Sequence, residues 1–480
     1  MTINIDPNSK ITFTKKDGLI LNSKKPGGSP DPSLLPLATL TDFTSKFVGV
    51  FRYNANYGRG VIAIKSNGVG VAPTMFASGA NGVDGQVDSG YNVAEFAVPE
   101  ILQTTLDDVS TVPFAETIQS FTGSLVNRAP DKGGWPNNPD ELQMTSMHFY
   151  DGKLLVNGAI YYDGNGENTT TSLIVDDASD LANSNITGQF GIQGAQHLTG
   201  WLVPTFEWAA TLGSEYLMGS GQSLAIVSRQ SAGPSLFSVD RDAIFAASAG
   251  DIVPSTAHLD YSLSNPLKDD RLNFGGTKKG RDLGLSNNGL MTSKCNHTFG
   301  IVVPEKRSYL VIGRGAGITP LPDSDDFNWH GSKTDFADKN GTLYYKGNVN
   351  AAGVAWTSTD PAPADYVRIA NKAGSDGAAG YETYDGADTG TQYLLYDLDE
   401  IAKASETYDP VPYESGYMAD IFPRAGQTGI PSGGENPPFS PTWDEPNKRL
   451  YLSLPYTDYH PGANGQTYSK QPLIAVYDFS

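Results

Sequence analysis

The sequence predicts an all-β fold built from sequential antiparallel sheets, and three observations predict it. β-hairpin patterns recur along most of the chain, each is followed by a short strand that ends on an acid or a proline, and no helix of ordinary length is indicated. The chain has 480 residues, 39% of them hydrophobic, with 53 Gly and 31 Pro. This composition is that of a globular, turn-rich protein with enough apolar residues for a large core.

The hairpins share one pattern, in which two apolar runs flank a polar corner. The corner is Asp-Gly in MTSMHFYDGKLLVNG (144–158) and Asn-Gly in GVIAIKSNGVGVAPT (60–74). Both dipeptides tolerate positive φ, so they are strong hairpin signals. Further copies are TFGIVVPEKRSYLVIG (298–313), SPTWDEPNKRLYLSLPYTDY (440–459) and a looser pair formed by 199–213 and 223–230.

The closing strands divide the chain into five units. They end near Pro99, Asp176, Asp240, Asp397 and Asp478, and four of the five continue into a run long enough for one helical turn. The interval from Asp240 to Asp397 is the longest, yet it contains one clear hairpin and one clear closing strand. We therefore interpret it as one unit, the fourth, that carries an insertion at 314–391.

Five sequential β-meander units predict a β-propeller with about five blades, although six or seven are also compatible, over a single domain 1–480. The pattern is similar to the β-propeller superfamily at large, and that resemblance implies an architecture and no functional residues. The alternative is a pair of packed β-sandwiches. A ring must close, and KITFTKKDGLIL (10–21) is the strand-turn-strand segment that we expect to pair with the last blade beside LIAVYDFS (473–480).

The charge and the termini restrict the partners and the location. The formal net charge of −20 argues against nucleic acid and anionic membranes, because phosphate binding needs a concentrated cationic face. The N-terminus has no apolar core of signal-peptide length, and no run approaches a membrane span. We expect no membrane insertion and a soluble protein, cytoplasmic or associated with a virion or surface. The lone cysteine, Cys295, excludes an internal disulfide and is expected to be buried.

The first candidate site is FRYNANYGRG (51–60), where Arg52, Tyr53, Tyr57 and Arg59 alternate with Asn and Gly. Tyrosine rings can stack on sugar faces, and a guanidinium can bind a carboxylate or sulfate through two hydrogen bonds. These residues therefore predict a glycan contact. The alternative is an edge strand whose arginines are solvated or form salt bridges within the blade.

Two further stretches are candidates. KDDRLNFGGTKKGRD (268–282), with Arg271 and Arg281, is the most cationic run of the chain, and the insertion carries Trp329 and His330 as a possible aromatic cap over a pocket. We expect no cofactor, with Ca²⁺ as the one possibility, because the insertion also supplies hard oxygen ligands at Asp323, Asp325 and Asp326. Their spacing does not match an EF-hand, and a solvated acidic loop is the competing interpretation.

Two classes of function remain. The first is a non-catalytic binding or structural propeller that recognises glycan, or neighbouring subunits of a virion or surface assembly. The alternative is a polysaccharide lyase or glycoside hydrolase. His197 lies next to Trp201, and His460 lies among tyrosines. With a tyrosine and an arginine nearby, either could abstract a proton beside a uronic carboxylate, although a structural histidine is the simpler interpretation of each. The absence of a recognisable catalytic motif favours binding.

Overall fold

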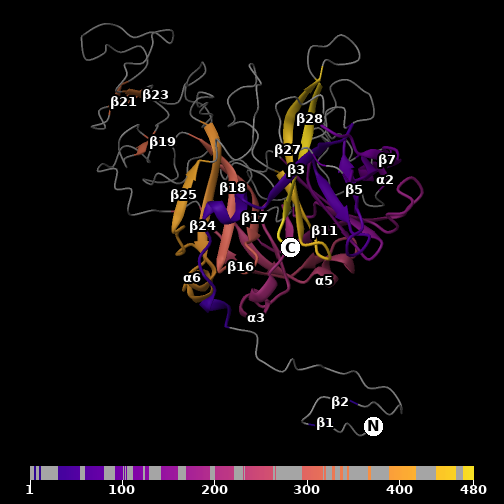
Figure 1. Ribbon diagram of the computed structural model, residues 1–480, viewed down its shortest axis with the longest axis horizontal. Helices are drawn as coiled ribbons and strands as arrows, with labels where there is room; N and C mark the ends of the chain where they lie inside the picture. Colours follow the sequence, from indigo (N-terminus) through magenta and orange to yellow (C-terminus); the bar gives the residue numbers. More distant parts are fainter. Residues whose placement is uncertain are drawn as a thin grey trace.

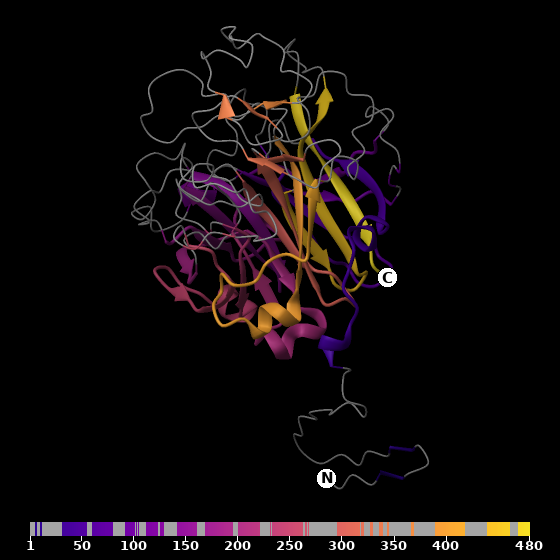
Figure 2. The same ribbon diagram turned by 90° about the vertical axis from the view of Figure 1, so that its left-hand side faces the viewer.

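A computed structural model describes the chain from the N-terminal strands to Ser480, with gaps (Figures 1 and 2). The described residues are 5–6, 10–11, 31–54, 60–79, 92–100, 102, 104, 112–122, 125–128, 142–160, 169–194, 200–220, 231, 233–262, 265, 267, 295–316, 318–320, 327–329, 336–338, 343–344, 366–368, 389–417, 439–460 and 469–480.

The chain forms five blades, each built on four antiparallel strands, and in blades 1 to 4 the spatial order of these four strands follows their order in the sequence. Blade 1 is β4 (Ile62–Lys65), β5 (Thr74–Ser78), β6 (Val93–Ala97) and β7 (Glu116–Gln119). Blade 2 is β8 (Leu142–Tyr150), β9 (Lys153–Ile160), β10 (Ser172–Val175) and β11 (Ile186–Ile192), to which β15 (Ile252–Val253) adds in parallel. Blade 3 is β12 (Leu202–Pro204), β13 (Tyr216–Met218), β14 (Leu236–Val239) and β16 (Ser255–Leu259).

The last two blades follow the same plan. Blade 4 is β17 (Asn296–Val302), β18 (Ser308–Ala316), β24 (Thr389–Asp397) and β25 (Glu414–Tyr417). Blade 5 is β26 (Phe439–Asp444), β27 (Arg449–His460), β28 (Ser469–Asp478) and, from the N-terminal part of the chain, β3 (Phe47–Arg52).

The blades form a closed ring, because the described core divides into five clusters that each fill the space between two neighbouring blades. Leu173 and Phe76 belong to the cluster between blades 1 and 2, and Phe237 to that between blades 2 and 3. Trp201 lies between blades 3 and 4, and Leu310 between blades 4 and 5. A fifth cluster, between blades 5 and 1, completes the cycle. The protein is therefore a five-bladed β-propeller, as predicted, and not a pair of sandwiches.

The first strand of each blade lies innermost, since β4, β8, β12, β17 and β26 contact one another across the axis. An innermost strand is an edge strand, so one row of its backbone groups lacks a partner within its own sheet. On β4, side chains of β26 take that role: Thr442 Oγ1 accepts from Ile64 N at 3.0 Å, and Ser440 Oγ bonds both the N and the O of Ile62 at 3.1 Å. These bonds hold blade 5 against blade 1 at the axis.

The turns have the chemistry that the sequence indicates. Asp151 and Gly152 have φ of 47° and 79°, the conformation that a tight hairpin between β8 and β9 requires. The acids after two closing strands start helices: Asp240 Oδ1 accepts from Ala243 N at 3.1 Å, and Asp397 Oδ1 accepts from Asp399 N at 3.0 Å.

The ring is closed by an N-terminal strand, but by a different one from the strand predicted. β3 pairs with β28 from Phe47↔Tyr477 to Leu473↔Arg52, which occupies the edge assigned to 10–21. Residues 10–11 pair instead with Ile5–Asp6, as β2 (Lys10–Ile11) and β1 (Ile5–Asp6). The physical reason is apolar content: Val50 and Phe51 are buried on opposite faces of β3, and the polar KITFTKKDGLIL segment offers no such pair of faces.

The looser third hairpin also needs a correction. The partner of β12 is β13 (Tyr216–Met218), not 223–230, because the short helix α3 (Ala209–Leu212) and a Gly213 with φ of 77° bring the chain back earlier. In blade 4, β18 and β24 stay paired as far as Ala316↔Thr389. The chain between them contains β19 (Ile318–Pro320), β20 (Phe327–Trp329), β21 (Phe336–Asp338), β22 (Leu343–Tyr344) and β23 (Tyr366–Arg368).

Helices are short throughout the described residues. They are η1 (Pro32–Leu34), α1 (Leu40–Thr44), α2 (Leu125–Arg128), η5 (Phe206–Trp208), α3 (Ala209–Leu212), α5 (Arg241–Phe245) and α6 (Leu398–Lys403). No helix in the described part of the chain combines the length and the apolar character that crossing a membrane requires.

Closure by β3 predicts a difference between two truncations. Removal of residues 1–52 takes away β3, exposes the edge of β28 and uncovers the pocket of Phe51, whose loss alone costs about 3–5 kcal/mol. Removal of 1–30 leaves β3 in place. We expect the longer truncation to lower the thermal midpoint and to aggregate in size-exclusion chromatography, and the shorter one to behave like the full chain. Equal damage by both truncations would contradict closure by β3.

Candidate functional site

The described residues enclose a cavity on the propeller axis, at the end where the first strands finish. Figure 1 draws this end at the bottom, with α3, α5 and α6, and we call it the lower end. The cavity has a volume of about 210 Å³ and is called the axial cavity. It is lined by the last residues of the first strands of four blades, among them Ile64, Tyr150, Pro204 and Trp443, and by Arg241 of α5.

Arg241 is the central side chain of this region. Its guanidinium carbon lies 3.7 Å from the ring centroid of Tyr150 and 4.2 Å from that of Tyr216, so that two aromatic faces hold it. Arg241 Nη1 also donates a hydrogen bond to the Tyr216 hydroxyl, and Nε lies 3.9 Å from Asp242 Oδ1. Residues of blade 2 (Tyr150) and blade 3 (Tyr216, Arg241) are thus joined at the cavity wall.

The electrostatics of the cavity keep its phenols protonated. Burial, with the negative charge of Glu445 second, raises the pKa of Tyr216 to about 12. A hydrogen bond with Asp242 raises the pKa of Tyr150, and the positive charge of Arg241 opposes that shift. At neutral pH both phenols therefore retain a proton that they can donate to an acceptor.

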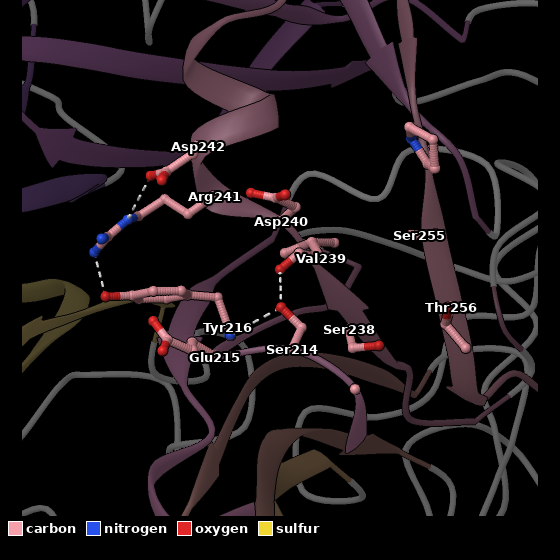
Figure 3. A pocket seen from close by; sticks show the side chains of 12 residues that line it. Ser214, Glu215, Tyr216, Ser238, Val239, Asp240, Arg241, Asp242, Ser255 and Thr256 are labelled. Atoms are coloured by element: carbon pink, nitrogen blue, oxygen red, sulfur yellow. Dashed lines mark hydrogen bonds and ion pairs between the residues drawn. The ribbon is translucent and has the colours of Figure 1, made fainter. Parts of the chain in front are cut away.

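A second cavity, the flanking cavity, adjoins the first and shares Tyr216 and Arg241 with it. Its volume is about 420 Å³, and its walls come from the β12–β13 connection, the start of α5 and the start of β16. Figure 3 shows Arg241 reaching across to Tyr216 and Asp242, while Ser214 bonds the carbonyl of Val239. Glu215, Asp240 and Asp242 bring carboxylates to this cavity.

His148 lines the axial cavity from β8 and is 5% exposed. Its Nε2 lies 3.2 Å from Ser146 Oγ, which also accepts from Asn157 Nδ2 at 2.9 Å. Burial lowers the pKa of His148 to about 3, so the imidazole is neutral at physiological pH. His297, on β17, is buried in the same way, and burial lowers its pKa to about 4.

Two of the predicted ligand contacts, Arg52 and Tyr53, are described, and both serve the blade. Arg52 is 3% exposed, donates from Nε to the Val112 carbonyl at 2.9 Å and stacks on Phe114. Tyr53 is fully buried and donates to the Ser78 carbonyl at 3.0 Å. The interpretation as a structural strand end fits these contacts, and a role of the two residues in ligand binding stays a prediction.

The other predicted site residues either end strands or lie outside the described residues. Trp329 ends β20, where it pairs with Ile318, and His460 ends β27, where it pairs with Ser469. Outside the described residues lie Tyr57, Arg59, His197, Arg271, Arg281, His330 and the proposed Ca²⁺ ligands Asp323, Asp325 and Asp326. Within the described ranges, no three His, Cys, Asp or Glu side chains lie close enough together to hold a metal ion.

Sequence reasoning missed the lower-end residues, although one signal was present. At the ends of two first strands an aromatic residue is followed by Asp, as Tyr150-Asp151 and Trp443-Asp444, and both aromatic residues line the axial cavity. Arg241 directly follows the helix-capping landmark Asp240.

The comparisons with known proteins add little. No protein-family model matches the sequence, and no curated protein matches it. Among solved structures, the native Bacillus subtilis arabinanase Arb43A is similar at 11% identity and a TM-score of 0.34, over 90% of this chain and 96% of that one. A likeness of this degree supports no inference about function. The β-propeller assignment rests on the sheets and the cores.

The buried histidine predicts a pH dependence of stability. The pKa of His148 is about 3 in the folded state against 6.5 in a free histidine, so its stability contribution is complete above pH 6.5. Below pH 6.5 the histidine is protonated in the unfolded chain but stays neutral in the folded chain. By pH 5 the free energy of unfolding is therefore lower by about 2 kcal/mol. We expect His148→Gln to lose less free energy of unfolding between pH 7 and pH 5 than the wild type in urea titrations. Parallel pH profiles would contradict this.

Proposed function

We propose that this propeller is a non-catalytic binding protein that recognises a saccharide at its lower end. The observation that carries the proposal is the axial cavity, where four first strands and α5 converge on Arg241 between Tyr150 and Tyr216. Ligand sites in proteins are concave, mostly apolar and supplied with a few convergent polar groups. The axial cavity is concave and has convergent polar groups, and its wall is divided between polar and apolar surface.

The wall chemistry suits a saccharide. Phe149, Leu202, Phe245 and Trp443 offer apolar and aromatic surface against which the C–H faces of a sugar can pack. Polar groups lie among them: the hydroxyls of Ser66 and Thr442, and the carboxylates of Asp151 and Glu445. A volume of about 210 Å³ is below the roughly 300–1,000 Å³ of sites for drug-sized ligands, which favours one terminal sugar unit.

The protonation states support binding over turnover. General acid–base catalysis is most efficient when the pKa of the group lies near the working pH. Burial moves the pKa of His148 to about 3 and that of Tyr216 to about 12, both far from neutrality. These groups are suited to fixed hydrogen bonding of a ligand and poorly suited to proton transfer.

A glycan-active enzyme is the second candidate, and one observation favours it. Asp151 and Glu445 line the same cavity, and glycoside hydrolysis uses two carboxylates that flank the scissile bond. The two candidates differ in whether an oligosaccharide stays intact after incubation. Assembly of this propeller with neighbouring subunits, as in a virion or surface layer, stays a separate prediction.

Tyr216 provides the test of the proposal. On a glycan array the full chain should retain saccharides above background, and Tyr216→Ala should weaken the best of them about tenfold in calorimetry, because one aromatic wall is lost. Tyr216→Phe is the matched control, since it keeps the ring on Arg241 and should stay within about threefold of the wild type. An array without binders would refute the saccharide proposal. New reducing ends in the incubated samples would instead establish the enzyme.

A further inference from the structure

We infer that the lower-end site selects saccharides by charge: it favours those with an ammonium group, then uncharged ones, over uronic or sulfated ones. The inference rests on the proposed function and names the ligand class. It departs from the expectation that arginine beside tyrosine marks a site for acidic sugars.

The charges around the two cavities are mostly negative. Five carboxylates line the axial and flanking cavities together: Asp151, Glu215, Asp240, Asp242 and Glu445. Arg241 is the one cationic side chain among the residues that line them, and His148, with its pKa lowered to about 3 by burial, stays neutral. A ligand in either cavity therefore meets a negative potential.

The surroundings of Arg241 restrict the approach of an anion to its guanidinium. Its guanidinium carbon lies over the rings of Tyr150 and Tyr216, 3.7 and 4.2 Å from their centroids. Its edge donates to the Tyr216 hydroxyl and lies 3.9 Å from the carboxylate of Asp242. Nη1 is engaged with the Tyr216 hydroxyl, and Nε is buried without a hydrogen-bond partner. Neither pair of adjacent donors is therefore open to the two-bond contact by which a guanidinium binds a carboxylate.

The flanking cavity is where an ammonium group would gain most. Figure 3 shows Glu215, Asp240 and Asp242 around it, on the β12–β13 connection and at the start of α5. Asp240 and Asp242 come from the first turn of α5, and Asp240 already caps that helix through Ala243 N. These three carboxylates are exposed at the rim. Solvent screening therefore keeps the attraction between each carboxylate and a ligand ammonium group small. The preference for cationic over anionic saccharides comes from the three carboxylates together.

The experiment compares three probes with one backbone: β-1,4-linked tetramers of glucosamine, glucose and glucuronic acid. At low ionic strength we expect glucosamine to bind tightest and glucuronic acid weakest, with about fivefold between successive probes. For the double variant Glu215→Gln/Asp240→Asn, the ratio of the dissociation constants of the glucuronic acid and glucosamine tetramers should be smaller than in the wild type by about fivefold or more. Asn remains a good helix cap, so α5 should persist, and unchanged circular dichroism would verify this.

The whole chain is acidic and could attract any cation, so a matched control is needed. Glu116→Gln/Glu400→Gln removes the same charge from two exposed positions outside both cavities and should leave the ratio as in the wild type. Two outcomes would overturn the charge selectivity and leave the proposed function intact. One is that the glucuronic acid tetramer binds as tightly as the glucosamine tetramer, or more tightly; the other is that both double variants change the ratio equally. If none of the three tetramers binds, the inference fails; the proposed function then depends on the array alone.

Discussion

The pairing of β3 with β28 is the interaction on which the rest of the structure depends. Successive residues of a strand face opposite sides of a sheet, and β3 uses both sides. Val50 joins the core between blades 4 and 5, and Phe51 joins the core between blades 5 and 1. One N-terminal strand thus completes the fourth position of the last blade and contributes to two of the five interfaces between blades. Without it, the ring has an open sheet edge.

The closed ring creates the axial cavity, because the wall is shared among blades that are distant in sequence. Trp443 and Thr442 come from the last blade, Ile64 from the first, and Tyr150 and Pro204 from the second and third. The bond from Ile64 N to Thr442 Oγ1 fixes two of these strands at the axis. A flat row of sheets would leave the same side chains apart, so the site is a property of closure and not of any single blade.

The sequence predicted what local chemistry determines. Asp151-Gly152 marks a hairpin, and Asp240 and Asp397 mark strand ends that start helices. It did not predict which N-terminal segment closes the ring. Pairing between residues about 430 positions apart depends on burial of both faces of the added strand, and segment 47–52 can bury both faces whereas 10–21 cannot. The sequence also did not predict the cavity, because Tyr150, Tyr216 and Arg241 come from different strands and a helix and lie close together only in the folded ring.

Hydrogen–deuterium exchange with and without a bound saccharide tests the central claim, that ligands bind at the lower end of the axis. Binding there should slow exchange in peptides that cover the β8–β9 turn, the β12–β13 connection, α5 and the β26–β27 turn, which line the two cavities. Slowed exchange confined to peptides from 51–60 or 268–282, with these four segments unchanged, would contradict the account and favour the ligand contacts predicted from the sequence.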